Sequence, residues 1–171
     1  FVLLPLAADA YTLKVGIEVL VFALASFSLA LLISNGGIVS FGHAAYFGIG
    51  AYAAGLLVTK LGVTMVPALV LAPVVAAVFA GLYGAFIVRL SGIYLAMLTL
   101  AFAQITYAVA FQWVELTGGD NGVVGVWPSE WARGRIVYYY LTLVLCGATI
   151  AALFHIIHAP FGYALRAARD S

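Results

Sequence analysis

The feature that most constrains this chain is a set of long stretches without an ionised side chain. No Asp, Glu, Lys or Arg occurs within residues 19–59, 61–88, 90–114 or 136–165. About 20 apolar residues of α-helix cross a bilayer core of about 30 Å. A charged residue at the centre of such a helix costs about 2.5–3.5 kcal/mol. A soluble fold of this length could not cover so much apolar surface, so the pattern predicts a membrane protein.

Five apolar segments define the predicted fold, which is all-α, a polytopic transmembrane helical bundle with spans near residues 15–34, 43–59, 66–88, 91–113 and 136–157. The run 19–59 is too long for one span. Asn35-Gly36-Gly37 divides it, because Asn and Gly are poor helix formers and favour turns. The 43–59 segment is short for a full crossing, so a re-entrant helix there stays open. A β-barrel is disfavoured, because the apolar runs are continuous rather than alternating.

The ends of the chain suggest part of a longer polypeptide. The sequence starts at Phe1 without a methionine and stops at Ser171 within a basic segment. We therefore expect residues 1–171 to form a single but partial transmembrane domain.

Catalytic and cofactor motifs are not evident in the sequence. Gly48-Ile-Gly50 resembles the start of a dinucleotide fingerprint, but it lies inside an apolar helical run without the preceding strand that this motif needs. His155 and His158 could share a metal, although a pair near a helix C-terminus, favourable to the dipole, explains them better. We predict no catalytic residue, no metal site and no cofactor.

Polar residues around the break form the first candidate site. Polar groups at membrane depth are costly and tend to line pathways or to pair with protein partners. The tentative translocation-path residues are Asn35, Gly36, Gly37, Ser40, Gly42, His43, Gly48 and Gly50. The alternative is that Ser40 caps the next helix and that His43 lies at the headgroups.

Two further segments carry candidate residues. The polar loop 114–135 contains Gly118, Gly119, Asp120 and Asn121, a composition typical of tight turns. Residues 159–170 predict a short amphipathic helix: Phe161, Leu165 and Ala168 share an apolar face, and Arg166 and Arg169 lie on the other side. Pro160 and Gly162 are predicted to end the preceding span. The arginines could instead be a positive-inside membrane anchor.

Four blocks of sequence resemble a known family. Residues 36–52 (GGIVSFGHAAYFGIGAY) resemble the signature of the LivM-type permease subunit of branched-chain amino acid ABC importers. Residues 92–104 (GIYLAMLTLAFAQ), 116–122 (LTGGDNG) and 160–170 (PFGYALRAARD) are similar to the later blocks of that family, in the same order. Family members usually have more helices on both sides. Tyr163 stands where a basic residue is common.

The resemblance implies a permease subunit in a bacterial or archaeal inner membrane that translocates branched-chain amino acids or related small amino acids or amides. It implies a second permease subunit, two cytoplasmic ATPase subunits, a periplasmic or lipid-anchored binding protein and surrounding lipid as partners, and no nucleic acid. ATP hydrolysis would belong to the separate subunit, so this chain is not expected to be an enzyme. Phe161, Gly162, Leu165, Arg166 and Arg169 would then couple to the ATPase.

The same resemblance gives an orientation. With residues 160–170 cytoplasmic, loop 114–135 lies outside and the 35–43 connection lies toward the cytoplasm. We then expect Gly118, Gly119, Asp120 and Asn121 to face the binding protein or to serve only as a connection. The count of Lys and Arg mildly disagrees with this orientation. An ion-coupled secondary transporter or a channel is the alternative function.

Overall fold

The computed structural model describes Pro5, residues 9–87 and residues 89–170, and the regular secondary structure of this part of the chain is helical. The helices are α1 Ala10–Gly36, α2 His43–Thr59, α3 Met65–Ile87, α4 Gly92–Gln112, α5 Val114–Thr117, α6 Arg135–His158 and α7 Pro160–Asp170, with 3-10 turns η2 Gly119–Asn121 and η3 Glu130–Ala132. No strand occurs among these residues. The predicted all-α class is confirmed.

Four of these helices, α1, α3, α4 and α6, are long and apolar enough to cross a membrane. The chain is therefore a polytopic helical membrane protein. Helix α2, with 17 residues, is a shorter apolar helix. The expected spans overlap these helices, but Ser91 and Trp113 of the fourth span flank α4 as its caps, and residue 88 falls outside the described residues. Helix α1 starts at Ala10, earlier than expected, and includes Lys14 and Glu18.

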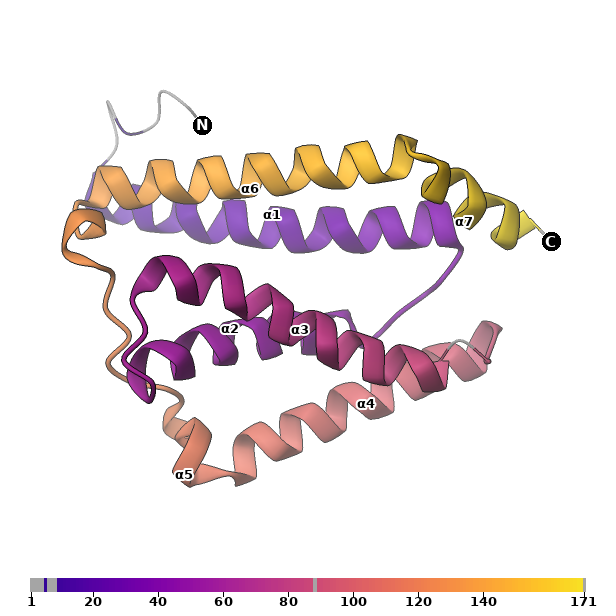
Figure 1. Ribbon diagram of the computed structural model, residues 1–171, viewed down its shortest axis with the longest axis horizontal. Helices are drawn as coiled ribbons and strands as arrows, with labels where there is room; N and C mark the ends of the chain where they lie inside the picture. The colour runs from indigo at the N-terminus through magenta and orange to yellow at the C-terminus, as the bar shows by residue number, and fades with distance from the viewer. Residues whose placement is uncertain (1–4, 6–8, 88, 171) are drawn as a thin grey trace. The chain divides into compact units, whose positions relative to one another are not determined.

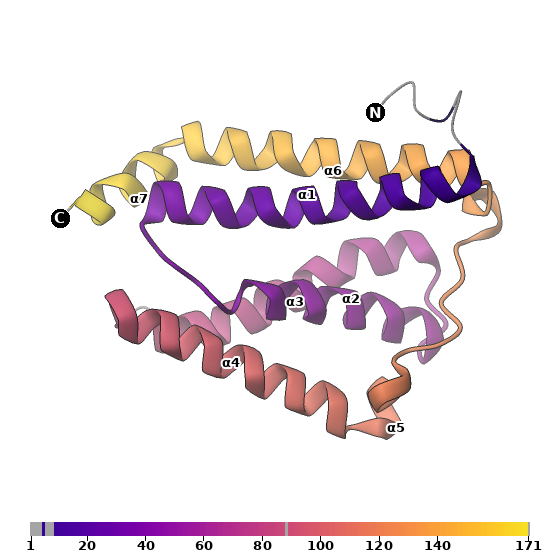
Figure 2. The same cartoon turned by 180° about the vertical axis from the view of Figure 1, so that it is seen from behind.

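Helices α1, α6 and α7 belong to one of two compact units, which comprises residues 1–38 and 130–171. Figures 1 and 2 show α1 and α6 side by side, with α7 turned away from the line of α6 beside the end of α1. The two long helices run parallel, because their starts are together and both end near α7. Leu13 and Gly16 of α1 and Tyr139 and Cys146 of α6 are buried.

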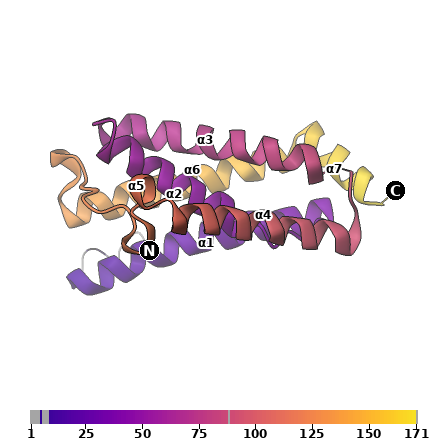
Figure 3. The same ribbon diagram turned by 90° about the horizontal axis from the view of Figure 1, so that it is seen from below.

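Helices α2, α3, α4 and α5 belong to the second unit, residues 39–129. Helix α2 packs against both α3 and α4, which are drawn apart along much of their length in Figure 3. Small side chains allow this packing: Ala68 and Ala72 are buried in α3, and Ala96 is buried in α4. Close approach through small residues is how membrane helices gain van der Waals contact.

An aromatic cluster joins α2, α3 and α4. The ring of Tyr83 in α3 stacks on Phe102 in α4 with centroids 4.4 Å apart, and the ring of Tyr46 in α2 lies 6.1 Å away. The Tyr83 hydroxyl forms a 2.9 Å hydrogen bond with Thr106 Oγ1. Tyr83 is half-buried, and this bond gives its hydroxyl a partner inside the unit.

Candidate functional site

The predicted break begins at Gly37, after Asn35 and Gly36 have completed α1. Gly37 has the left-handed backbone conformation (φ 63°, ψ 11°), and its N–H donates to Ile33 O at 3.0 Å. This geometry is a common helix C-cap that glycine adopts without strain. The side chain of Asn35 is buried and its Nδ2 donates to Leu31 O at 3.0 Å and to Ser34 Oγ at 3.1 Å.

Helix α7 is bonded to this end of α1. Arg166 Nε donates to Asn35 Oδ1 at 2.7 Å, and an Arg169 guanidinium N–H donates to Ser34 O. The guanidinium carbon of Arg166 also lies 5.7 Å from the centre of the Tyr163 ring. From sequence, both arginines were expected to be available to a soluble partner. In the structure both form contacts within the chain.

Close approach accompanies these hydrogen bonds. A Cβ on Gly36 would lie 3.6 Å from Leu165 Cδ2, and a Cβ on Gly37 would lie 2.7 Å from Arg169 Cγ. Leu165 is half-buried and therefore faces α1 in part, whereas Phe161 and Tyr163 are 64% and 60% exposed. The side chain of Ala168 lies outside the described residues.

The turn from α6 to α7 differs in detail from the expected one. Helix α6 ends at His158, Ala159 is extended, and Pro160 is the first residue of α7 rather than the end of the span. Proline suits the first helical position, since its fixed φ is already helical and no N–H partner is needed there. Gly162 lies inside α7 and is buried, and a Cβ on it would lie 1.9 Å from Ile157 O.

The start of α2 is fastened to α4 through Thr99. The backbone N–H of Phe41 donates to Thr99 Oγ1 at 3.1 Å, and a Cβ on Gly42 would lie 2.7 Å from Thr99 O. Thr99 is 3% exposed, and its hydroxyl donates to Ala96 O at 2.8 Å. The partner of Thr99, the backbone N–H of Phe41, carries no sequence signal for this bond.

The remaining residues of the break lie around this contact. Ser40 is buried, and it does not cap α2, because Gly42 is the N-cap and no side chain bonds there. His43 is the half-buried first residue of α2. Nothing lies within 4 Å of a Cβ placed on Gly48, and one on Gly50 meets Ala76 Cβ at 3.9 Å. Of Gly42, Gly48 and Gly50, Gly42 is the one at which an added Cβ would clash with a neighbouring helix.

The polar loop forms a compact turn at the end of α4. Gly118 has a positive φ of 80°, and a Cβ on it would lie 2.1 Å from Gly122 O. Thr117 is buried, its hydroxyl bonds to Trp113 O at 2.8 Å, and Gly119 N–H donates to it at 3.3 Å. Asp120 and Asn121 are exposed. The turn therefore presents these two side chains outward on a backbone that glycine alone permits at Gly118.

Loop residues also contact the end of α2. A Cβ on Gly55 would lie 3.3 Å from Val123 Cγ1, and Lys60 Nζ donates to Glu115 O at 3.2 Å. Neither contact was predicted. Gly55 is one of several glycines in an apolar helix, and the sequence alone does not show which of them a loop covers.

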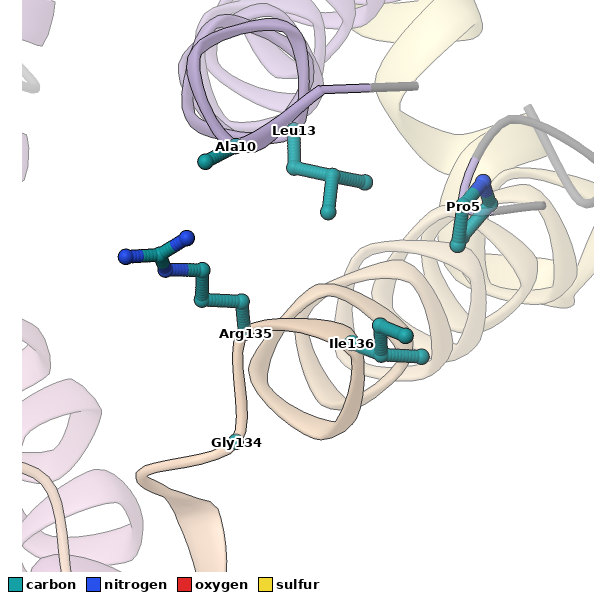
Figure 4. Close-up of a pocket in the computed structure, with 6 residues that line it drawn as sticks. All are labelled: Pro5, Ala10, Leu13, Gly134, Arg135 and Ile136. Atoms are coloured by element: carbon teal, nitrogen blue, oxygen red, sulfur yellow. The ribbon is translucent and has the colours of Figure 1, made fainter. Parts of the chain in front are cut away.

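The other features of the described residues indicate no chemistry. No group of three or more His, Cys, Asp or Glu side chains there could hold a metal, and His158 Nδ1 forms a 2.8 Å hydrogen bond with Phe154 O. A pocket between the starts of α1 and α6 is lined by Pro5, Ala10, Leu13, Gly134, Arg135 and Ile136. Figure 4 shows the side chains of Leu13 and Arg135 at this pocket, where Arg135 is the one charged residue.

Known proteins match the part of the chain that contains the four sequence blocks. A family model described as the permease component of branched-chain amino acid transport systems matches residues 11–171. The high-affinity branched-chain amino acid transport system permease protein LivM is 25% identical in Escherichia coli (strain K12) and 24% in Salmonella typhimurium (strain LT2), each over 193 residues. Each match covers 97% of this chain and 45% of the relative, so the chain spans about half the length of these curated relatives. No solved structure matches.

Proposed function

Because the chain belongs to the permease component family of branched-chain amino acid transport systems, we propose that it forms part of the membrane subunit of an ABC importer. The substrate would be a branched-chain amino acid or a related small amino acid or amide. The observation that carries this proposal is the family match over residues 11–171, together with the four ordered sequence blocks. ATP hydrolysis would take place on a separate cytoplasmic subunit, and a second permease subunit and a binding protein would complete the importer.

The geometry of the first unit supports a shared cytoplasmic side for the break and α7. Helices α1 and α6 run parallel, and α7 contacts the end of α1. If α7 meets the ATPase in the cytoplasm of a bacterial or archaeal cell, Asn35 and Gly37 lie on that side of the inner membrane too. This agrees with the orientation expected from the resemblance.

Alternating access gives the mechanism of the proposed importer. Nucleotide binding and hydrolysis would move the ATPase, α7 would follow, and the helices would expose a central path to each side in turn. A ligand shifts such an equilibrium only through different affinities for the two states. Residues 35–50 would form part of the path or of the helix contacts beside it.

Uptake in vesicles tests this function directly. The complete permease is reconstituted with its second permease subunit, ATPase and binding protein, and the entry of labelled leucine, isoleucine and valine is measured. We expect uptake to need ATP on the side of the membrane where the ATPase lies. We also expect it to need the binding protein on the opposite side. Uptake driven by a proton or sodium gradient without ATP would instead establish the ion-coupled alternative.

The outward turn at Gly118–Gly122 is proposed to meet the binding protein. Asp120 and Asn121 are exposed on a turn whose neighbouring glycines have positive φ, so changing their side chains leaves the backbone requirements of Gly118 untouched. We expect Asp120→Ala with Asn121→Ala to raise the binding-protein concentration needed for half-maximal uptake about tenfold, the effect of losing about 1.4 kcal/mol of contact. Membrane insertion should stay normal. An unchanged half-maximal concentration would leave the turn as a connecting loop only.

A further inference from the structure

Two hydrogen bonds from α7 converge on the last turn of α1. The guanidinium of Arg166 reaches the buried Asn35 side chain through a 2.7 Å bond from Nε to Oδ1, and that of Arg169 reaches the backbone carbonyl of Ser34. The bonded residues are more than 130 positions apart in the chain.

Positive charge at the C-terminal end of α1 stabilises that helix. The last carbonyls of a helix lack partners within the helix, and the negative end of its dipole favours a positive charge. Helix α1 has no basic residue in its own last turn. Arg169 and Arg166 supply that charge from α7, and a charge-assisted hydrogen bond of this kind is stronger than a neutral one.

Buried polarity makes the contact specific. Asn35 is 8% exposed, and its amide Nδ2 is already bonded to Leu31 O and Ser34 Oγ. Its Oδ1 accepts from Arg166. Removing the arginine would leave a buried acceptor without that donor, which is more costly than losing an exposed hydrogen bond.

The glycine after this turn lets the two segments touch. A Cβ on Gly37 would come 2.7 Å from Arg169 Cγ, so the arginine stem lies directly against the backbone at the break. Residues 37–42 continue from here to the start of α2. Any displacement of α7 is therefore applied at the point where the chain leaves α1.

We infer that Asn35, Arg166 and Arg169 form an intramolecular clamp that fixes α7 to the end of α1 and transmits movement of α7 to the Gly37 break. The three are positioning residues and do not themselves bind the ATPase. The inference rests on the proposed function, in which α7 is the segment that docks on the ATPase. The side of α7 that carries the exposed Phe161 is then the docking face.

Cysteine cross-linking tests the clamp without any partner. In the complete permease carrying Cys146→Ser, Gly36→Cys and Leu165→Cys are joined by a short bifunctional thiol reagent, because Leu165 lies beside Gly36. We expect efficient cross-linking and about tenfold slower cross-linking once Arg166→Gln is added, the factor that corresponds to one lost charge-assisted bond. Arg89→Gln, an arginine in the α3–α4 turn, should leave the rate unchanged. Equal rates with and without Arg166 would overturn the clamp.

Assays of the assembled transporter distinguish a clamp from direct binding of Arg166 to the ATPase. Arg166→Gln should still co-purify with the ATPase, which should still hydrolyse ATP, while uptake per ATP falls about tenfold. Asn35→Ala should do the same, and the double variant should be no worse than either single variant, because both remove one interaction. Loss of the ATPase from Arg166→Gln would show that the arginine binds the partner and would overturn the clamp.

One further variant tests whether α7 docks on the ATPase, independently of whether the clamp exists. Phe161→Asp changes the exposed side of α7 and should lose the ATPase, with normal cross-linking of the Gly36→Cys and Leu165→Cys pair. Full retention of the ATPase by Phe161→Asp would count against docking through α7. The cross-linking rates would still decide the clamp in that case.

Discussion

Alanine at Gly162 is expected to disconnect α7 from α6 and abolish uptake. The added Cβ would lie 1.9 Å from Ile157 O and 2.5 Å from the Ile157 carbonyl carbon. Both are backbone atoms, so no side-chain rotation relieves the clash and the α6–α7 turn must open. Forcing one extra carbon into a packed position commonly costs about 1–3 kcal/mol, and a backbone clash this short lies at the upper end. Uptake and the cross-link between positions 36 and 165 should both fall to background.

Gly147→Ala, in the preceding helix α6, is the matched glycine-to-alanine control. Nothing lies within 4 Å of a Cβ placed on Gly147, so the substitution adds no clash. Alanine is favoured over glycine in a helix by about 1 kcal/mol, and we expect normal or slightly higher stability with full uptake. Equal behaviour of the two variants would mean that the tight α6–α7 turn is not part of the working transporter.

The helices were predictable because the membrane penalises charge so strongly. Stretches without Asp, Glu, Lys or Arg located α2, α3, α4 and α6 to within a few residues, although they could not decide whether α2 crosses. The start of α1 at Ala10 was missed because the first span was set to begin at residue 15, just after Lys14. A charged side chain near a helix end can extend along the helix to the interface, so it marks the limit of the apolar core and not the limit of the helix.

The contacts of the candidate site were less predictable, because they depend on which residues meet in space. The amphipathic pattern of residues 159–170 located a helix and its two arginines, but the charge alone does not say whether an arginine pairs with a partner protein or with its own chain. Asn35 was noticed as a helix breaker. Its bond to Arg166 needs the parallel arrangement of α1 and α6, which no local pattern specifies.

Glycines show the same limit within one motif. Gly42, Gly48 and Gly50 all belong to the block that resembles the family signature, and sequence gave them equal weight. The structure distinguishes them, since a Cβ on Gly42 meets backbone at 2.7 Å and one on Gly48 meets nothing within 4 Å. Spacing reports that small residues recur, whereas the neighbouring helix decides which of them must be small.

The substitution Gly42→Ala is accordingly expected to destabilise the packing of α2 on α4, whereas Gly48→Ala is not. Gly42 has ordinary backbone angles (φ −86°, ψ 0°), so alanine causes no backbone strain there and the effect is one of space alone. Its Cβ would lie 2.7 Å from Thr99 O and 3.3 Å from Thr99 Cβ, which pushes the start of α2 away from α4. We expect a loss of about 3 kcal/mol in the free energy of unfolding in detergent micelles. Uptake should fall with it, and Gly48→Ala should match the parent protein.

A second substitution shows whether the loss arises at the contact with Thr99. Thr99→Val keeps the shape of the side chain but removes the oxygen that accepts the Phe41 N–H at 3.1 Å, leaving that N–H without its partner at a cost of about 1–3 kcal/mol. Because Gly42→Ala already separates these groups, the double variant should lose clearly less than the sum of the two single losses. Two changes that act on one contact cannot each remove it in full. If the losses in unfolding free energy of the two single variants simply add in the double variant, Gly42→Ala does not act through the contact with Thr99.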